Sequence, residues 1–187
     1  MNVQVKKHLI TVEKYDQMII AGVFNEDNRL ELIGGEIIEM SPIGIPHVAY
    51  VNKLNNLFSR HLLDEVIVSV QNPINLDTFS EPEPDIALLQ PRDDFYTGGL
   101  AEPEDIFLLI EVADTSLEYD RTIKLPRYAQ AGIMEVWIVN LNDQQVEIYR
   151  RPSPTGYLKT AKPDKNQPFT PLAFPHLELT TQIIFGP

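Results

Sequence analysis

The sequence predicts a mixed α/β fold of the α+β type, in which helices flank a central mixed sheet. Two observations predict it. Segments with apolar residues at helical spacing are interleaved with short apolar runs typical of strands, and glycines and prolines separate these segments. The chain has 187 residues, of which 43% are hydrophobic, enough to bury a sizeable core. Because no repeat and no linker divides it, we expect residues 1–187 to form a single domain.

The first part of the chain predicts an N-terminal helix followed by a hairpin. The helix is expected over residues 12–21, because Thr11 can cap its first turn and Gly22 can end it. Residues 30–40 then form two short apolar runs separated by Gly34 and the glycine after it. Since such a glycine pair suits a tight turn, we expect an antiparallel hairpin here.

The strongest helical pattern covers residues 46–63. Pro46 lies in the first turn, where its missing backbone N–H is harmless. We therefore expect a long amphipathic helix after the hairpin. Its apolar face is expected to consist of Val48, Val51, Leu54, Leu57, Phe58, His61 and Leu62.

The rest of the chain predicts strands around one further helix. Strands are expected at residues 66–76, 84–89, 106–113, 135–140 and 145–149, with a short one at 157–159. A helix is expected within residues 114–132, although an interior proline costs about 3 kcal/mol. Because of Pro126, we expect its regular part to begin only at about Thr122 and to end at Gly132. The apolar segment 169–185 is expected to return to the core.

The composition excludes several classes of function. With 15 basic and 27 acidic side chains, the chain carries a net charge of −12, which counts against a broad surface that coats nucleic acid. The absence of cysteine excludes disulfides, zinc–thiolate sites and thiol nucleophiles. The motifs of nucleotide-triphosphate, dinucleotide, serine-hydrolase and zinc-protease sites are absent as well. Polar first residues and short apolar runs predict a cytoplasmic protein without signal peptide or membrane span.

Two neighbouring apolar strands each carry a carboxylate at one end. Asp85 opens the first of them, and Glu111 lies near the end of the second. If the strands pair antiparallel with residue 90 opposite residue 106, Asp85 lies opposite Glu111, with Cβ atoms about 4.5–5.5 Å apart. Two like charges so close would raise one pKa, and a divalent cation such as Mg²⁺ removes the conflict. The pattern therefore predicts a metal site.

A structural interpretation of the same residues stays open. Asp85 can simply begin a strand after a proline. Glu111 can lie at the solvent end of its strand, paired with Arg121 or Lys124. Spacing alone does not separate this interpretation from the metal site.

Lys124 is the third candidate of the site. It follows Glu111 by thirteen residues, on the segment that leaves the strand. If this segment returns over the end of the strand, the ammonium can orient an attacking water or offset charge on a phosphoryl oxygen. The alternative is an ion pair with Asp120 on the same helix, worth only about 0.2–0.5 kcal/mol. His47, at the start of the long helix, can touch a phosphate or serve as a capping or surface residue.

Four blocks of sequence resemble the PD-(D/E)XK nuclease superfamily, and more specifically its Uma-type restriction endonuclease family. They occur in order over nearly the whole chain, and together they are specific to the family. The blocks are residues 31–42 (ELIGGEIIEMSP) with His47 after them, 83–87 (EPDIA), 108–116 (LLIEVADTS), and 119–129 (YDRTIKLPRYA) running into 132–139 (GIMEVWIV).

The resemblance implies a restriction-endonuclease-like core and a metal-dependent endonuclease that acts on DNA. It implies that Asp85 and Glu111 bind Mg²⁺, or Mn²⁺ in its place, and that Lys124 assists catalysis. Glu31 matches the early acidic residue of the family and would contribute a further carboxylate. The lysine that the superfamily places two positions after the glutamate is Ala113 here, whereas the family's lysine on the following helix matches Lys124. A homodimer would suit double-strand cleavage.

Two other functions stay open beside the nuclease. A non-catalytic binding or assembly protein on the same fold is favoured by the acidic composition. A hydrolase of small phosphodiesters is a third interpretation, because net charge matters less for a small substrate.

Overall fold

The computed structural model describes residues 7–25 and 28–186. The expectation that the chain lacks a signal peptide concerns residues 1–6 in part, and these lie outside the described residues. None of the helices in the described ranges is long and apolar enough to cross a membrane.

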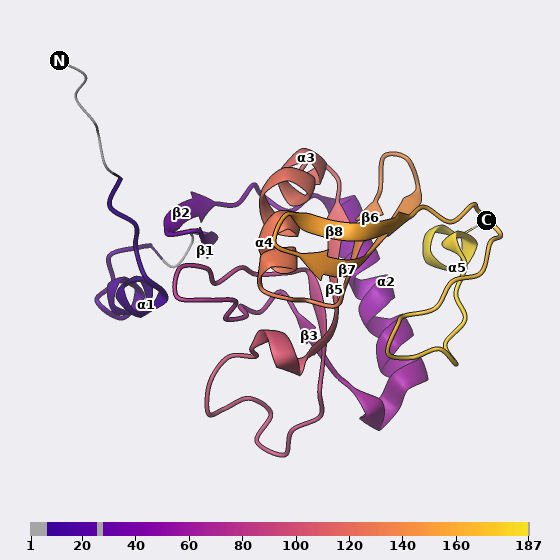
Figure 1. The fold of residues 1–187 in the computed structure, drawn as a ribbon, viewed down its shortest axis with the longest axis horizontal. Coiled ribbons are helices and arrows are strands. Elements are labelled where there is room, and N and C mark those ends of the chain that lie inside the picture. The colour runs from indigo at the N-terminus through magenta and orange to yellow at the C-terminus, as the bar shows by residue number, and fades with distance from the viewer. Residues whose placement is uncertain (1–6, 26–27, 187) are drawn as a thin grey trace.

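A helix and a small hairpin come first and lie to one side of the main sheet (Figure 1). They are α1 (Val12–Ile20), β1 (Leu30–Ile33) and β2 (Glu36–Glu39), as predicted. The Thr11 side chain accepts a hydrogen bond from Lys14 N–H and so caps α1. Gly34 and Gly35 have φ of 59° and 79°. Both therefore take the left-handed backbone that a tight hairpin turn requires and that glycine adopts without strain.

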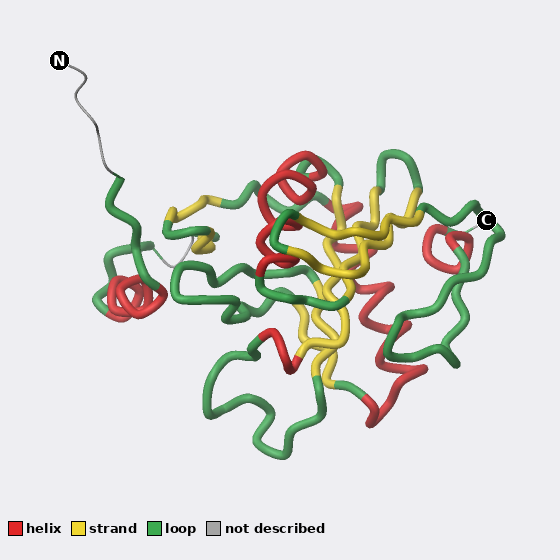
Figure 2. The backbone as a smooth tube through the Cα atoms, in the orientation of Figure 1, coloured by secondary structure: helices red, strands yellow, loops and turns green. Residues whose placement is uncertain are grey.

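The main sheet has six strands in the order β3-β4-β5-β6-β7-β8. Figure 2 shows its strands in yellow, with helical segments in red around them. Neighbouring strands are antiparallel except β5 and β6, which are parallel, so the sheet is mixed, as predicted. The strands are β3 (Ile67–Val70), β4 (Ile86–Leu89), β5 (Ile106–Ala113), β6 (Glu135–Asn140), β7 (Gln145–Ser153) and β8 (Gly156–Ala161).

The predicted boundaries of several strands are wrong, and the strand expected from residue 84 begins only at Ile86. The strand expected at 66–76 ends at Val70, because Gln71 has a φ of 51° and Pro73 offers no N–H to a neighbouring strand. The last two strands, β7 and β8, are longer than expected. They form a regular antiparallel pair that reaches to Ala161.

Helices cover both faces of the sheet. Successive residues of a strand point to opposite faces, so the apolar strands β4 and β5 contribute to two separate core clusters. The first cluster joins them to α2 (Ile45–Leu62), through Val51, Leu54, Leu57, Phe58, Leu62, Ile86, Leu88, Leu108, Ile110 and Val112. The second lies on the opposite face and includes Ala87, Leu89, Leu109, Tyr128, Ile133 and Val136. Val48 and His61 were expected in the apolar face of α2, but both are exposed. Val48 lies in the first turn of the helix and is 45% exposed.

The connection from β5 to β6 is helical from Leu117 onward, so the prediction that regular helix begins at Thr122 is wrong. It consists of α3 (Leu117–Tyr119), a π-helical turn η3 (Asp120–Lys124) and α4 (Leu125–Gln130). In the π-helical turn, Leu125 N–H donates to Asp120 O, five residues back. Pro126 then falls in the first turn of α4, where its missing N–H is tolerated.

The remaining elements are short. They are the 3₁₀ turns η1 (Leu63–Glu65) and η2 (Pro103–Asp105), and the C-terminal helix α5 (Thr181–Phe185). The segment 169–185 returns to the core, as predicted. Its buried apolar residues are Phe169, Phe174, Leu177, Leu179 and Ile184.

The register between β4 and β5 decides which carboxylates meet. Ile86 pairs with Ile110, so the next step of the ladder brings Asp85 beside Glu111, as predicted. The predicted pairing of residue 90 with residue 106 is wrong. An irregularity between Leu88 and Leu89 shifts the register by one residue at that end of the strands.

Candidate functional site

Asp85 and Glu111 lie on the same face of the sheet. Along β5, Ile110 and Val112 point toward α2, so Glu111 points toward α3 and α4. Asp85 precedes Ile86, another residue of the α2 face, and so shares the face of Glu111. Both carboxylates are buried and line one cavity. The interpretation that Glu111 lies at the solvent end of its strand is therefore wrong.

Asp85 is held by three hydrogen-bond donors. Val112 N–H donates to Oδ2 across 2.8 Å, which fixes the carboxylate against β5. At Oδ1, Gln71 Nε2 donates across 3.2 Å and His47 Nε2 lies 2.8 Å away. The interpretation of His47 as a capping or surface residue is wrong, because its ring contacts Asp85 from the first turn of α2.

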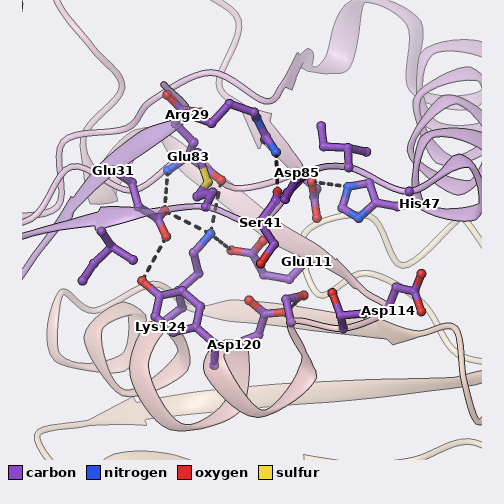
Figure 3. Close-up of a pocket in the computed structure, with 18 of the residues that line it drawn as sticks. Arg29, Glu31, Ser41, His47, Glu83, Asp85, Glu111, Asp114, Asp120 and Lys124 are labelled. Atoms are coloured by element: carbon purple, nitrogen blue, oxygen red, sulfur yellow. Dashed lines mark hydrogen bonds and ion pairs between the residues drawn. The ribbon is translucent and has the colours of Figure 1, made fainter. Parts of the chain in front are cut away.

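The ammonium of Lys124 lies among three acceptors (Figure 3). Its Nζ is 3.2 Å from Glu111 Oε1, 3.2 Å from Glu31 Oε2 and 3.2 Å from the main-chain oxygen of Glu83. Each proton of the buried ammonium therefore has an acceptor. Arg121, the other cation proposed for Glu111, pairs instead with Glu147 on β7.

Glu31 supports Lys124 from β1. Its Oε2 also accepts from Glu83 N–H across 3.2 Å, and its Oε1 accepts from Tyr119 OH across 3.0 Å. Glu31 is fully buried. Its two oxygens thus fix the ammonium and the segment that leads to β4, and this places Glu31 next to Lys124 rather than next to Asp85.

The side chains of Tyr128 and Asp120 complete the group around Lys124. Tyr128 OH donates to Glu111 Oε1 across 2.5 Å, and Ser116 Oγ donates to Asp120 Oδ2 across 2.7 Å. Asp120 and Tyr128 stand four residues before and after Lys124, so a common helix face brings them to the same place. Sequence analysis did not select either residue for the site, although this spacing was a usable signal.

Burial is the largest influence on the pKa values of the acidic groups in this site. It raises the pKa of Glu111 to about 8, against the lowering effect of Lys124. It likewise raises the pKa of Asp120 to about 6. Burial alone would lower the pKa of Lys124, but the carboxylates around it, Glu111 and Glu31 foremost, raise this pKa above its usual value. The ammonium therefore stays charged at neutral pH.

These side chains line a cavity of about 300 Å³. The connection from β2 to α2 forms one wall and the start of the β5–β6 connection forms the other (Figure 3). Arg29 Nη1 donates to Ser41 O across 3.2 Å and ties down the first wall. The other lining residues include Glu39, Met40, Pro42, Ile43, Gly44, Asp114, Thr115, Ser116 and Tyr119.

The donor set can be tested for its fit to a divalent cation. Four buried carboxylates, those of Glu31, Asp85, Glu111 and Asp120, face a single buried ammonium among the described residues of the cavity. Glu111 Oε2 accepts no hydrogen bond from the described residues. An excess of buried negative charge with a free carboxylate oxygen suits a hard cation.

The number of protein side chains available as ligands limits which metal ions this site could bind. Within the described ranges, no group of three or more histidine, aspartate or glutamate side chains is arranged to hold a metal. Mg²⁺ commonly takes one or two carboxylates and keeps several waters. A site built on Asp85 and Glu111 would therefore leave the remaining positions of Mg²⁺ or Mn²⁺ to water, and it is not a closed site made by protein alone.

Comparisons with known proteins show the family of the chain and a similar fold. A family model described as Uma2, putative restriction endonuclease, matches residues 12–182 of the chain. No curated protein matches it. The fold is similar to a crystal structure described as a putative nuclease belonging to DUF820 from Anabaena variabilis ATCC 29413. The TM-score is 0.72 at 15% identity, over 94% of this chain and 97% of the other, which confirms the predicted fold class.

Proposed function

Because the chain belongs to the Uma2 family of putative restriction endonucleases, we propose that it is a nuclease that hydrolyses phosphodiester bonds of DNA with the help of Mg²⁺. One observation carries the proposal. Asp85, Glu111 and Lys124 come from three separate segments and converge on one cavity, with Lys124 Nζ 3.2 Å from Glu111 Oε1. This is the arrangement expected of two metal-binding carboxylates with a catalytic cation beside them.

Each residue has a role that its contacts support. Asp85 and Glu111 would hold the cation, and the hydrogen bonds of Asp85 fix its carboxylate before the ion arrives. A bound Mg²⁺ lowers the pKa of its water and polarises a phosphoryl oxygen. Lys124 would stabilise, through its positive charge, the negative charge that grows on the phosphoryl group. Glu31 would act as a positioning residue, because it fixes the ammonium of Lys124.

A second function is favoured by the net charge of −12. A chain this acidic is repelled by polyanions, so a non-catalytic binding or assembly role on the same fold is the alternative. We propose a homodimer only for the case in which the protein cuts both strands of a DNA duplex. Activity against DNA separates the two functions.

The test is cleavage of plasmid and single-stranded DNA with Mg²⁺, with Mn²⁺ and with a chelator. We expect cleavage with either ion and none with the chelator. Asp85→Asn and Glu111→Gln should each lower the rate about 100-fold or more while the circular dichroism spectrum stays native. Asp93→Asn, an exposed carboxylate outside the cavity, is the matched control and should cut like wild type. Normal cleavage by both site variants would refute the site, and an inactive wild type would support the binding role.

A further inference from the structure

The proposed catalytic groups line a cavity and are almost completely buried. Glu111 is 3% exposed, Lys124 4% and Asp85 8%. A phosphate of a double helix lies on a broad cylinder, between neighbouring phosphates and beside the paired strand. A flexible single strand can bring one phosphate to buried groups more easily than such a duplex can.

The cavity is small compared with a duplex. Its volume of about 300 Å³ corresponds to about ten water molecules and lies at the lower end of small-molecule pockets. Hydrogen bonds tie both walls to the body of the protein. Arg29 Nη1 donates to Ser41 O across 3.2 Å, and Asn142 Nδ2 donates to Asp114 O across 2.7 Å. The space therefore suits one nucleotide unit of a flexible strand.

The charge of the lining also disfavours a duplex. Duplex affinity depends on basic side chains that neutralise many phosphates at once. Among the described residues that line the cavity, Arg29 and Lys124 are the two permanent cations, and Lys124 is engaged by Glu31 and Glu111. Seven acidic residues line the same space: Glu31, Glu39, Glu83, Asp85, Glu111, Asp114 and Asp120. The site can thus pair with very few phosphates.

The start of α2, next in the chain to residues that line the cavity, carries exposed apolar side chains. Ile45 is 87% exposed and Val48 is 45% exposed, at the start of α2 and next to the lining residues Gly44 and His47. Pro46 lies exposed between them. Unpaired bases expose apolar faces that such side chains can contact, whereas the bases of a duplex are stacked away.

We propose that the substrate of this site is an unpaired strand, which passes one phosphodiester at a time into the cavity while its bases lie on Ile45 and Val48 at the start of α2. This inference rests on the nuclease function proposed above. A duplex is then a poor substrate, because a nucleotide must first leave its pair and its stack.

The experiment compares three probes with Mn²⁺ present. They are a labelled unpaired oligonucleotide, the same strand annealed to its complement, and bis(p-nitrophenyl) phosphate. We expect kcat/KM for the duplex to be about 100-fold lower than for the unpaired strand. The logarithm of KM for the unpaired strand should change with the logarithm of salt concentration with a slope of only about 1, because about one phosphate is neutralised.

Variants at exposed apolar positions complete the test. Ile45→Ser should raise KM for the unpaired strand with little change in kcat. Leu158→Ser, at a similarly exposed apolar position on β8 rather than at the start of α2, is the matched control. Equal or preferred cleavage of the duplex would overturn the inference and leave the nuclease function standing. Hydrolysis of bis(p-nitrophenyl) phosphate alone would overturn it in favour of small phosphodiesters. Failure to cleave any probe would remove the proposed function as well.

Discussion

Lys124 Nζ lies 3.2 Å from Glu111 Oε1, although the two residues stand on different elements thirteen positions apart. The contact exists because η3 returns over the end of β5. Ala113, where the superfamily that this chain resembles has its lysine, is buried at the end of the strand. A lysine from the following helix therefore supplies the cation beside Glu111.

Replacement of Lys124 tests how much the fold depends on this contact. Lys124→Ala leaves the carboxylates of Glu111 and Glu31 without their cation, so we expect a loss of about 3–5 kcal/mol in the free energy of unfolding. Urea denaturation without metal measures it. Mg²⁺ should restore part of the loss, because a bound divalent ion stabilises the folded state. Lys159→Ala, at an exposed position of β8, is the control. A variant as stable as wild type would contradict the buried network.

Stability without metal should fall as the pH rises from about 5 to about 8. Burial raises the pKa of Glu111 to about 8 and that of Asp120 to about 6, from ordinary values of 4.5 and 3.8. In this range the folded state binds protons that the unfolded state has released, so the free energy of unfolding decreases with pH. Urea midpoints in chelator across this range measure the slope. Glu111→Gln should flatten it, and an unchanged slope in that variant would disprove the assignment.

His47 is expected to act on the metal site through Asp85. Its Nε2 lies 2.8 Å from Asp85 Oδ1, so His47→Ala removes one of the contacts that orient the carboxylate. Changes to such supporting residues typically weaken metal affinity about 10–100-fold. Titration of Mn²⁺ followed by calorimetry measures the affinity.

A conservative variant separates positioning from folding at His47. His47→Gln keeps a side-chain donor and should recover much of the Mn²⁺ affinity lost in His47→Ala. His61→Ala, on the same helix but outside the cavity, is the control. Equal Mn²⁺ affinity in His47→Ala and wild type would show that the contact does not support the site.

A substitution of Glu81, which lies away from the cavity, is expected to stabilise the folded protein. Its Oε2 and Asn75 Oδ1 are buried without a hydrogen-bond partner among the described residues. Leu76 N–H donates to Ser80 O across 3.0 Å, so Asn75 and Glu81 are the next opposed pair of that hairpin. Burial raises the pKa of Glu81 to about 7. Glu81→Gln removes this charge and adds a donor, and should stabilise the protein by about 1–3 kcal/mol at pH 8.

Thermal or urea unfolding at pH 6 and pH 8 measures the Glu81→Gln effect. The gain should be larger at the higher pH, where the wild-type carboxylate is ionised, because its raised pKa means that ionisation costs stability. Glu39→Gln, an exposed residue of β2, is the control and should change little. A destabilised Glu81→Gln at pH 8 would contradict the prediction.

The sequence predicted the elements of the fold well, because periodicity and turn residues are local properties. Thr11, Gly34 and Gly35 act as their residue types suggest. The predictions were wrong where the backbone of the folded chain departs from what the local sequence pattern indicates. Pro126 was expected to delay the helix, but a π-helical turn absorbs it, and the left-handed backbone of Gln71 ends β3 early. Neither adjustment leaves a periodic signal in the sequence.

The site was predicted in part. Counting along two apolar strands from one assumed residue pair placed Asp85 opposite Glu111, and the structure has this register at that end of the strands. Counting residues along the strands could not predict which side chains contact each carboxylate. His47 was left between several roles, and Tyr128 and Asp120 were not selected, because their contacts depend on where two helices lie against the sheet.

By itself, the sequence determined which strands carry the two acids. It predicted that the acids share a face only for one assumed register, because side chains alternate along a strand. Only the tertiary structure decided that Lys124 turns inward, that Glu31 fixes it, and that Asp85, Glu111 and Lys124 line one cavity. The physical reason is that burial and charge compensation depend on segments far apart in the chain. A charge becomes strongly coupled only after folding removes water from around it.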